Sequence, residues 1–371
     1  MNILVDARAL VARPAGIAAV IIQSIKFITR YRPDVHFRLL APAPLNATVQ
    51  EALGSNPQVT IEVCPIKGFG GIPPLVWSNI RIPKAVIKYN PDLFWSPMAS
   101  LPAFWPTSVP RLITVYDVVH IEFKGTMTWR ARIGHMLTTK SAIRKADYIW
   151  TISDYTKDAL NKYYPSRKCK DIFVGCSVDT DLYNRDMEVN RSEVLKEHGL
   201  KGDFILFVGS LEPRKNLPYL ISLMPDLYNQ GLQLLVVGGK GWKNTSIFET
   251  INNPEFPTES VVFAKFVTNE QLAELYHVAE CFVSTSLNEG FGLPQLEALR
   301  CGCPVVTSHN SAMIEVVDGV GRTVEGWDKD VWINTIIEEV KRRKSFKVDD
   351  SKLKLYNWTY IVDSLFKYIG K

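Results

Sequence analysis

Residues 281–307 read CFVSTSLNEGFGLPQLEALRCGCPVVT, and this stretch decides the fold. An apolar run at 281–285 leads into a glycine-rich loop, which is followed by a helical pattern at 293–301 and a second apolar run at 304–307. Short, nearly continuous apolar runs are typical of strands buried on both faces of a parallel sheet. The stretch therefore predicts a strand, a loop at the carboxyl end of that strand, a helix and a neighbouring parallel strand.

The same alternation extends through the second half of the chain, which we expect to form a doubly wound α/β domain. The other strand candidates of this half are 203–209, 232–238 and 261–267, and the other helical patterns are 217–229 and 269–279. Open α/β sheets bind ligands beyond the carboxyl ends of their strands. The loops that follow these strands are therefore the first candidates for a site.

The first half repeats the alternation less regularly. Its strand candidates are 2–5, 37–41, 60–63, 93–95, 112–116, 148–152 and 172–174, and its helical patterns are 16–30, 128–145 and 153–163. A chain of 371 residues is long enough for two domains. We therefore expect two α/β domains, joined by the polar segment at 176–200.

The charges differ between the two halves. Met1–Gly175 contains 22 Lys and Arg residues against 11 Asp and Glu, whereas the rest of the chain contains 21 against 27. The stretch 124–145 contains no acidic residue, and its apolar residues fall on one face of an expected helix. It therefore either docks on an anionic membrane surface or packs its apolar face in the core. No nucleic-acid-binding motif accompanies it, so we expect no nucleic acid partner.

Two cations follow the strand candidate at 203–209. In the segment GSLEPRKN, Arg214 and Lys215 stand between the carboxyl end of this strand and the next helix. Adjacent Arg and Lys side chains at such a place can hold a diphosphate, with Arg as a fork and Lys as a point charge. A solvated basic turn is the alternative.

Glycine-rich turns follow two further strands. The turn VGGKGW, which contains Gly239, lets the backbone approach a ligand, although a simple tight turn explains it equally well. In NEGFGLPQLE, Gly290 and Gly292 expose N–H groups beside a helix N-terminus, where partial positive charge favours a phosphate. Glu289 precedes this helix and Glu297 lies inside it. The two carboxylates can therefore bind different parts of one elongated ligand.

These motifs resemble those of a known enzyme group. EGFGLPQLEALRCGCPVV is similar to the E-x7-E signature of retaining GT-B-type glycosyltransferases of the glycogen-synthase/sucrose-synthase-like group. GSLEPRKNL, VGGKGW and the opening DARAL with Gly16-Ile17 resemble its bacterial mannosyltransferase-like branch. The resemblance implies an α/β GT-B architecture. Its parts would be a Rossmann-like acceptor-binding domain at 1–180, a Rossmann-like nucleotide-sugar-binding domain at 195–350, and a C-terminal helix at 351–371 that packs on the first domain.

The resemblance also implies a role for each motif residue. Arg214 and Lys215 would neutralise the diphosphate leaving group. Glu289 would hold hydroxyls of the transferred sugar, and Glu297 would bind the ribose. The remaining donor-binding positions would be Gly16, Gly209, Gly239, Gly290, Phe291, Gly292 and Leu293. Members of the group commonly dispense with a metal, so we expect neither a metal ion nor another cofactor.

Two positions depart from the pattern of the branch. Gly16-Ile17 is followed by Ala18, where the branch usually has a second glycine. A strand ends in Tyr116-Asp117 where the branch usually has His-Asp, and His120 follows three residues later. The role of the family His, near the reacting centre, would pass to Tyr116, to His120 or to no residue. Asp117 would either contact the acceptor during catalysis or act structurally.

The implied function is retaining transfer of a hexose from a nucleotide diphosphate sugar, GDP-mannose first and a UDP-sugar second. The acceptor would be a glycan or a lipid-linked saccharide in cell-surface polysaccharide synthesis. The alternatives are a nucleotide-sugar epimerase and a catalytically inactive nucleotide-sugar-binding module. The sequence contains neither a signal-peptide pattern nor a run of about 18 apolar residues. We therefore expect a cytoplasmic protein, peripheral on the inner leaflet through 124–145.

Overall fold

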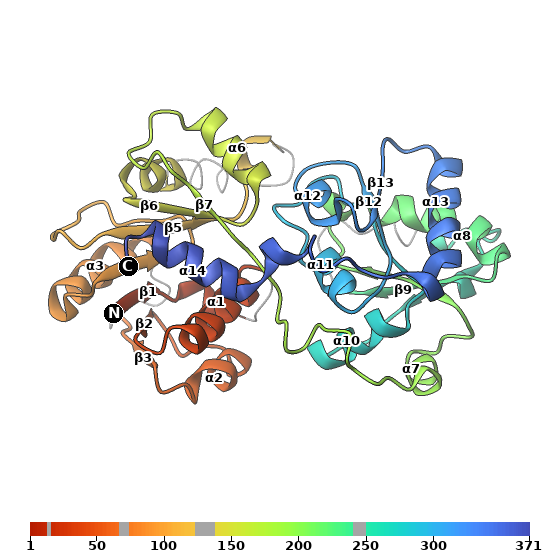
Figure 1. The fold of residues 1–371 in the computed structure, drawn as a ribbon, viewed down its shortest axis with the longest axis horizontal. Coiled ribbons are helices and arrows are strands. Elements are labelled where there is room, and N and C mark those ends of the chain that lie inside the picture. The colour runs from red at the N-terminus through yellow and green to blue at the C-terminus, as the bar shows by residue number, and fades with distance from the viewer. Residues whose placement is uncertain (13–15, 67–73, 123–137, 240–249) are drawn as a thin grey trace. The chain divides into compact units, whose positions relative to one another are not determined.

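The chain forms two compact units, which we call unit 1 and unit 2. The computed structural model describes residues 1–12, 16–66, 74–122, 138–239 and 250–371. Unit 1 comprises Met1–Ser177 and Leu355–Lys371, and unit 2 comprises Val178–Lys354. Each unit is a parallel sheet with helices on both faces (Figure 1), so the expectation of two doubly wound α/β domains is confirmed.

Unit 1 contains a seven-stranded sheet in the order β3-β2-β1-β4-β5-β6-β7. Its strands are β1 (Asn2–Asp6), β2 (His36–Ala41), β3 (Val59–Val63), β4 (Leu93–Ser96), β5 (Arg111–Val115), β6 (Tyr148–Thr151) and β7 (Phe173–Val174). Every neighbouring pair is parallel. Each strand agrees with its sequence prediction to within one residue at either end. Short segments rich in apolar residues therefore located the strands of this sheet.

Helices cover both faces of this sheet because its strands alternate their side chains between two cores. Ile3 and Val5 pack with α1 (Ile17–Tyr31), α2 (Ala47–Gly54) and α14 (Trp358–Tyr368). Leu4, between them, packs with α3 (Pro74–Tyr89) on the other face. On this second face, a further core cluster includes residues of α6 (Asp154–Tyr163) and of the helical stretch at 138–145.

The C-terminal helix α14 belongs to unit 1 although the whole of unit 2 precedes it in sequence (Figure 1). Trp358, only 1% exposed, stacks on Phe27 of α1 with a centroid separation of 5.2 Å. At the other end of the helix, the Tyr368 hydroxyl donates to the Asp171 carbonyl at 2.8 Å and accepts from the Ile149 amide at 3.1 Å. These contacts join the end of the chain to α1, to β6 and to the segment before β7.

Unit 2 contains a six-stranded parallel sheet in the order β10-β9-β8-β11-β12-β13. Its strands are β8 (Phe204–Val208), β9 (Gln233–Val237), β10 (Val261–Phe263), β11 (Cys281–Ser284), β12 (Val305–Ser308) and β13 (Arg322–Val324). The strand order reverses between β8 and β11, which pair with each other. The loops that follow these two strands therefore leave the sheet side by side, at the point where open α/β sheets bind ligands.

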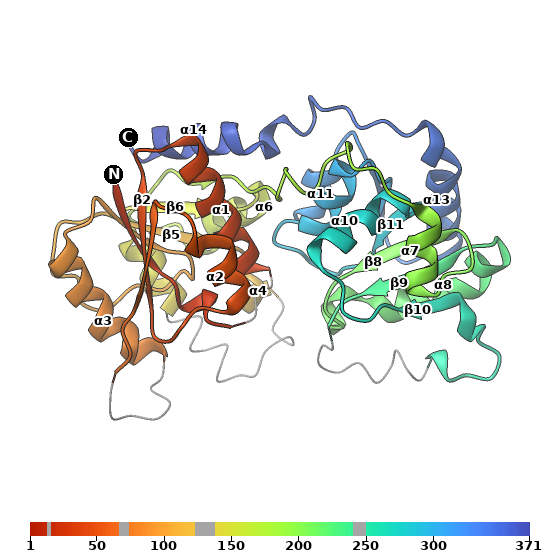
Figure 2. The ribbon, with the colours of Figure 1, turned by 90° about the horizontal axis from the view of Figure 1, so that it is seen from below.

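Two helical layers cover the sheet of unit 2 (Figure 2). One layer contains α8 (Leu217–Asn229) and α13 (Lys329–Arg342), which contact each other. The other contains α10 (Asn269–Val278), α11 (Leu293–Arg300) and α12 (Met313–Val317), with α7 (Arg191–His198) against α10. The helices predicted after β8, β10 and β11 are confirmed.

Some elements differ from the sequence predictions. The strand expected at 261–267 ends at Phe263, because its partner β9 ends one residue beyond the register position of Phe263. The sequence did not predict β13 or the helices α2, α3, α4 (Val119–Glu122), α7, α12 and α13. Of the helix expected at 128–145, residues 138–145 are described and helical, whereas 123–137 lie outside the described residues.

Replacing Trp358 by Ala should destabilise unit 1. The substitution leaves a cavity between α14 and Phe27, which costs about 3–5 kcal/mol for a buried Trp. Urea denaturation followed by circular dichroism measures this loss. Tyr360→Ala, at a side chain of the same helix that is 45% exposed, should change stability by no more than about 0.5 kcal/mol. Equal effects of the two substitutions would show that α14 adds nothing to unit 1.

Candidate active site

Two glycine residues, Gly209 and Gly238, let the ends of β8 and β9 approach each other closely. The Gly209 amide donates to the Val237 carbonyl at 2.9 Å, and a Cβ on Gly238 would lie only 1.9 Å from the Gly209 carbonyl oxygen. Any side chain at position 238 would therefore force the two strand ends apart. A Cβ on Gly209 would lie 3.2 Å from Cε of Lys215. Small residues thus allow the Lys215 side chain to lie against the end of β8.

The turn that carries the two cations is fixed to the loop after β11. Pro213–Lys215 form a short 3-10 turn. The Thr285 hydroxyl lies 3.2 Å from the Lys215 carbonyl oxygen and 3.1 Å from that of Asn216. The Leu287 amide donates to the Arg214 carbonyl at 2.8 Å. The backbone of one loop therefore positions the other, as expected for loops that follow adjacent parallel strands.

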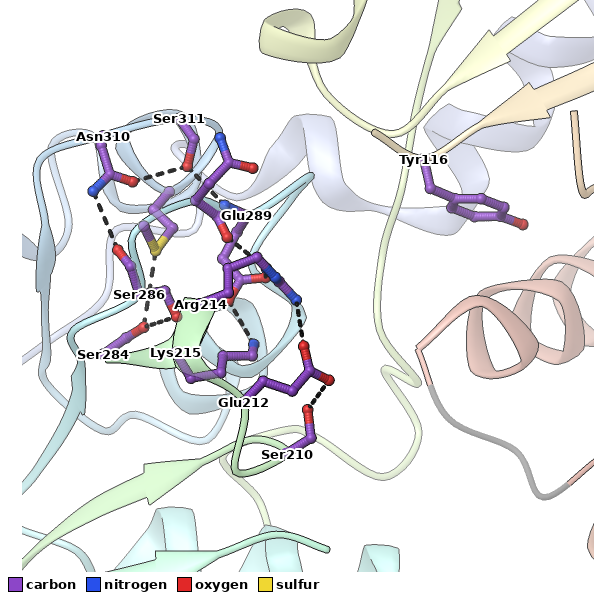
Figure 3. Close-up of polar contacts among 12 residues, drawn as sticks. Tyr116, Ser210, Glu212, Arg214, Lys215, Ser284, Ser286, Glu289, Asn310 and Ser311 are labelled. Atoms are coloured by element: carbon purple, nitrogen blue, oxygen red, sulfur yellow. Dashed lines mark hydrogen bonds and ion pairs between the residues drawn. The ribbon is translucent and has the colours of Figure 1, made fainter. Parts of the chain in front are cut away.

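Three charged side chains meet between these loops (Figure 3). Glu289 accepts from Lys215 Nζ on Oε1 at 2.5 Å and from Arg214 Nη1 on Oε2 at 2.7 Å. The exposed fractions of the side chains are 13% for Glu289, 12% for Lys215 and 22% for Arg214. We call these three residues the charge triad.

The charge triad keeps Glu289 ionised. Burial by itself would raise the pKa of this carboxyl group, but the Lys215 ammonium and the Arg214 guanidinium outweigh burial and lower the pKa to about 2. At neutral pH the group is therefore a carboxylate that accepts hydrogen bonds and has no proton to donate.

Polar residues after β12 hold the Glu289 backbone in place (Figure 3). The Glu289 amide donates to Ser311 Oγ at 2.9 Å, and this hydroxyl donates in turn to Asn310 Oδ1 at 3.0 Å. Asn310 Nδ2 donates to the Ser286 carbonyl at 3.1 Å. Ser311 has a φ of 50°, in the left-handed region that favours glycine. A strained non-glycine residue is retained at a place where its hydroxyl contacts the loop of Glu289.

The predicted glycine loop lies at the start of α11. Gly290, Phe291 and Gly292 precede Leu293, the first helical residue, and Phe291 is buried. Gly292 has a φ of 115° at the N-cap, a conformation that favours glycine. The loop therefore brings Glu289 and the positive end of the α11 dipole to one region of unit 2.

Glu297 lies in the second turn of α11 and has a partner of its own. The Tyr276 hydroxyl of α10 donates to Glu297 Oε2 at 2.9 Å. Burial raises the pKa of Glu297 to about 7, although the hydrogen bond from Tyr276 opposes this shift. The two glutamates of the predicted pair thus differ in protonation behaviour: Glu289 is ionised throughout the neutral range, and Glu297 titrates within it.

The candidates in unit 1 lie at loops after its strands. Gly16 is the N-cap of α1 and has a φ of 48°. Tyr116 and Asp117 follow β5 directly. The Tyr116 hydroxyl is buried with no hydrogen-bond partner among the described residues, and burial raises the pKa of this phenol well above its usual range. Asp117 is exposed. The backbone of His120 lies in the short helix α4 (Val119–Glu122), and its side chain lies outside the described part of the structure.

The structure brings the predicted Arg214, Lys215 and Glu289 into direct contact, whereas Glu297 lies apart from them with Tyr276. Gly209 and Gly239 are at the ends of β8 and β9, and the end of the VGGKGW turn lies outside the described residues. The sequence interpretation did not identify Ser311. A usable signal was present, because a polar run follows the strand predicted at 304–307, at the same edge of the sheet.

No group of three or more His, Cys, Asp or Glu side chains is placed to hold a metal ion within the described ranges. The charged groups found at the site are instead the two cations and the carboxylate of the charge triad. These cations have the chemistry that binds phosphate oxygens.

Comparisons with known proteins match the part of the chain that contains this site. The sequence model of the family described as "Glycosyl transferases group 1" matches residues 190–343, which include the whole charge triad. The O-antigen chain mannosyltransferase B of Escherichia coli is 28% identical over 247 residues, a match that covers 64% of this chain and 63% of that protein, less than two thirds of its length. The O-antigen chain mannosyltransferase RfbU of Salmonella typhimurium is 26% identical over 326 residues and is matched over 84% of both chains.

Solved structures share the fold along the whole chain. The sucrose-phosphate synthase of Thermosynechococcus elongatus superposes with a TM-score of 0.78 at 17% identity, and the match covers 100% of this chain and 98% of that one. The fold resemblance expected from the motifs is therefore confirmed over both units. The chain therefore has the GT-B fold, and the match of residues 190–343 to the glycosyl transferases group 1 model, together with the similarity to O-antigen mannosyltransferases, supports a GT-B glycosyltransferase of a mannosyltransferase-like branch.

Proposed function

We propose that the protein transfers a hexose from a nucleotide diphosphate sugar to a glycan or a lipid-linked saccharide, with retention of anomeric configuration. The observation that carries this proposal is the charge triad. Two cations and a carboxylate that is ionised at neutral pH lie where adjacent loops leave the sheet, beside the N-terminus of α11. A diphosphate and a sugar hydroxyl are the groups that such a site recognises together.

In this proposal the donor lies along the α11 loop. Arg214 and Lys215 bind the diphosphate, and the amides around Gly292 add partial positive charge. Glu289 accepts hydrogen bonds from hydroxyls of the transferred sugar, and Glu297 accepts them from the ribose. The proximity of Lys215 Nζ and Glu289 Oε1 supports this assignment, because a glycosyl phosphate presents its phosphate and its sugar hydroxyls close together.

The charge triad supports a reaction driven by stabilisation of the leaving group. A pKa of about 2 leaves Glu289 without a proton, so it does not act as a general acid at neutral pH. We propose a same-face displacement in which Arg214 and Lys215 neutralise the negative charge that develops on the departing diphosphate. Preorganised donors at such a position contribute about 2.7–4 kcal/mol to transition-state stabilisation. The two cations supply this charge, and we propose that no metal ion is required.

We also propose that the acceptor binds to unit 1. We propose that Asp117 contacts the acceptor together with Tyr116 or His120. The similarity to O-antigen mannosyltransferases favours GDP-mannose as donor, with a UDP-sugar as the second choice, and cell-surface polysaccharide synthesis as the setting. No helix within the described ranges has the length and apolar character needed to span a bilayer. We propose a cytoplasmic site of action, peripheral to the inner leaflet.

Incubating the purified protein with a panel of nucleotide sugars and analysing the products tests the class of function. We expect GDP-mannose to be consumed, with the anomeric configuration retained in the product and full activity in the presence of a chelator. Isomerised donor would indicate an epimerase, and binding without turnover would indicate an inactive binding module. Either of these results would replace the proposal.

Replacing Lys215 or Arg214 by Ala should lower kcat by about 100-fold or more, because each change removes one charge beside the leaving group. Steady-state kinetics with the active donor measure the loss. Lys201→Ala is the matched control, because Lys201 forms an ion pair with Glu259 at 2.7 Å on the surface of the same unit. It should leave turnover unchanged. Normal turnover in both site variants would show that neither cation takes part in the mechanism.

Replacing Ser311 by Gly should lower kcat by about tenfold or more without loss of stability. The change removes the hydroxyl that holds the Glu289 amide, while it relieves the left-handed backbone conformation. Kinetics and thermal denaturation of the same variant separate the two effects. Asn90→Gly provides the control, because Asn90 also has a positive φ, 40°, but ends α3 in unit 1. A fully active Ser311→Gly variant would show that Ser311 does not position Glu289.

A further inference from the structure

Helix α3 of unit 1 presents apolar side chains on two faces. Ile82, Ala85 and Val86 are buried against the sheet. Ile80 is 40% exposed and Ile87 is 61% exposed. The exposed residues lie seven apart, two turns of helix, so they share one face. The burial of one face accounts for the fold of α3. Among the described residues of unit 1, none covers Ile80 or Ile87 fully.

A loop extends this apolar face. The Ala103 amide donates to Asn79 Oδ1 of α3 at 2.7 Å, which places the loop after β4 against the exposed side of the helix. The next residue, Phe104, is 71% exposed. Lys145 Nζ donates to the Ala103 carbonyl at 3.1 Å and so brings a cation to the same place. We call the exposed side of α3 together with Phe104 the α3 surface.

Few acidic residues occur in the sequence around the α3 surface, although Glu62 of β3 lies beside α3, with its Oε1 3.9 Å from Lys88 Nζ. Residues 63–116 contain five Lys and Arg and one acidic residue, Asp92. The Asp92 carboxylate accepts from the Asn2 amide at 2.7 Å, so it is engaged at the start of β1. Lys84 and Lys88 are both exposed on α3. An apolar stripe beside cations is the pattern that binds an anionic bilayer interface.

We propose that the α3 surface docks on an anionic lipid bilayer. Exposed Ile and Phe side chains enter the boundary between headgroups and acyl chains, while Lys84 and Lys88 contact lipid phosphates. A nucleic acid would use the cations but not the aliphatic stripe. A second copy of the chain would bring like charges together, because a twofold interface pairs a surface with itself. An anionic bilayer uses both features.

The α3 surface does not include the stretch 124–145, although Lys145 at the end of that stretch contacts Ala103 beside it. From its sequence, that stretch either docks on an anionic membrane surface or packs its apolar face in the core. Residues 138–145 of that stretch are described, with Lys140 and Arg144 exposed. The proposal extends the peripheral location suggested above and is independent of the chemistry of the charge triad. It gives unit 1 a defined membrane-facing side, which a transferase with a lipid-linked acceptor requires.

Flotation of the full chain tests the proposal. The probes are vesicles of phosphatidylcholine and phosphatidylglycerol in equal amounts, and vesicles of phosphatidylcholine alone. We expect the protein to float with the anionic vesicles at low salt and less so at high salt. Ile80→Gln with Ile87→Gln should weaken binding roughly tenfold, because two apolar side chains lose their burial. Phe104→Gln and the pair Lys84→Gln with Lys88→Gln should each weaken it as well.

The matched control is Val331→Gln, at a side chain of α13 in unit 2 that is 49% exposed. It should float as the unchanged protein does. Equal flotation of the α3 variants and the control would overturn the proposal. Complete loss of binding in a variant that carries only Lys140→Gln and Arg144→Gln would overturn it as well. If the unchanged protein is a dimer and the variant with both Ile80→Gln and Ile87→Gln is a monomer, the α3 surface is an interface with a second copy of the chain, and the docking proposal is wrong.

Hydrolysis of the nucleotide sugar, measured on the same samples without vesicles, separates this proposal from the proposed function. The α3 variants should retain the hydrolysis rate of the unchanged protein. If the protein hydrolyses donor but does not float, the docking proposal fails and the transferase assignment stands. If it floats but neither transfers nor hydrolyses any sugar, the transferase assignment fails and the docking proposal stands.

Discussion

An ionised carboxylate held between two cations is the interaction on which the site of unit 2 depends. Glu289 lies 74 residues beyond Lys215 in the chain, and their contact at 2.5 Å joins the loop after β8 to the loop after β11. Removing one partner of a largely buried ion pair leaves an uncompensated charge, which costs about 3–5 kcal/mol. The three side chains of the charge triad therefore hold each other in position. The same ion pairs also hold the two loops together.

The parallel topology makes this interaction possible. β8 and β11 are neighbours because the strand order reverses between them, and this brings together two loops that a simple meander would separate. Gly238 removes the side chain that would part the ends of β8 and β9. Ser311 then connects a third loop to the Glu289 backbone. Electrostatics, backbone sterics and hydrogen bonding thus act on the same few residues.

The sequence located most of the strands because the central strands of both sheets are short apolar runs buried on both faces, whereas β13, with a single buried residue, was missed. It missed α3, which contains Pro83 within its helical residues. Arg214, Lys215 and Glu289 could be proposed individually from their places after strands. Their mutual contact could not, because it depends on which strands are neighbours. The role of Ser311 is set by the same spatial adjacency.

The position of α14 has a consequence for biosynthesis. The ribosome completes residues 1–177 and then the whole of unit 2 before it adds the helix that covers α1. During that interval the face of α1 that contacts Trp358 stays open to water and to other chains. Domains usually fold as they emerge, the N-terminal one first, and exposed apolar surface favours aggregation. Most of unit 1 is thus synthesised first, but unit 1 receives its last helix only after unit 2 is complete. A ribosome that stalls within unit 2 releases a unit 1 that lacks α14 and exposes part of its core.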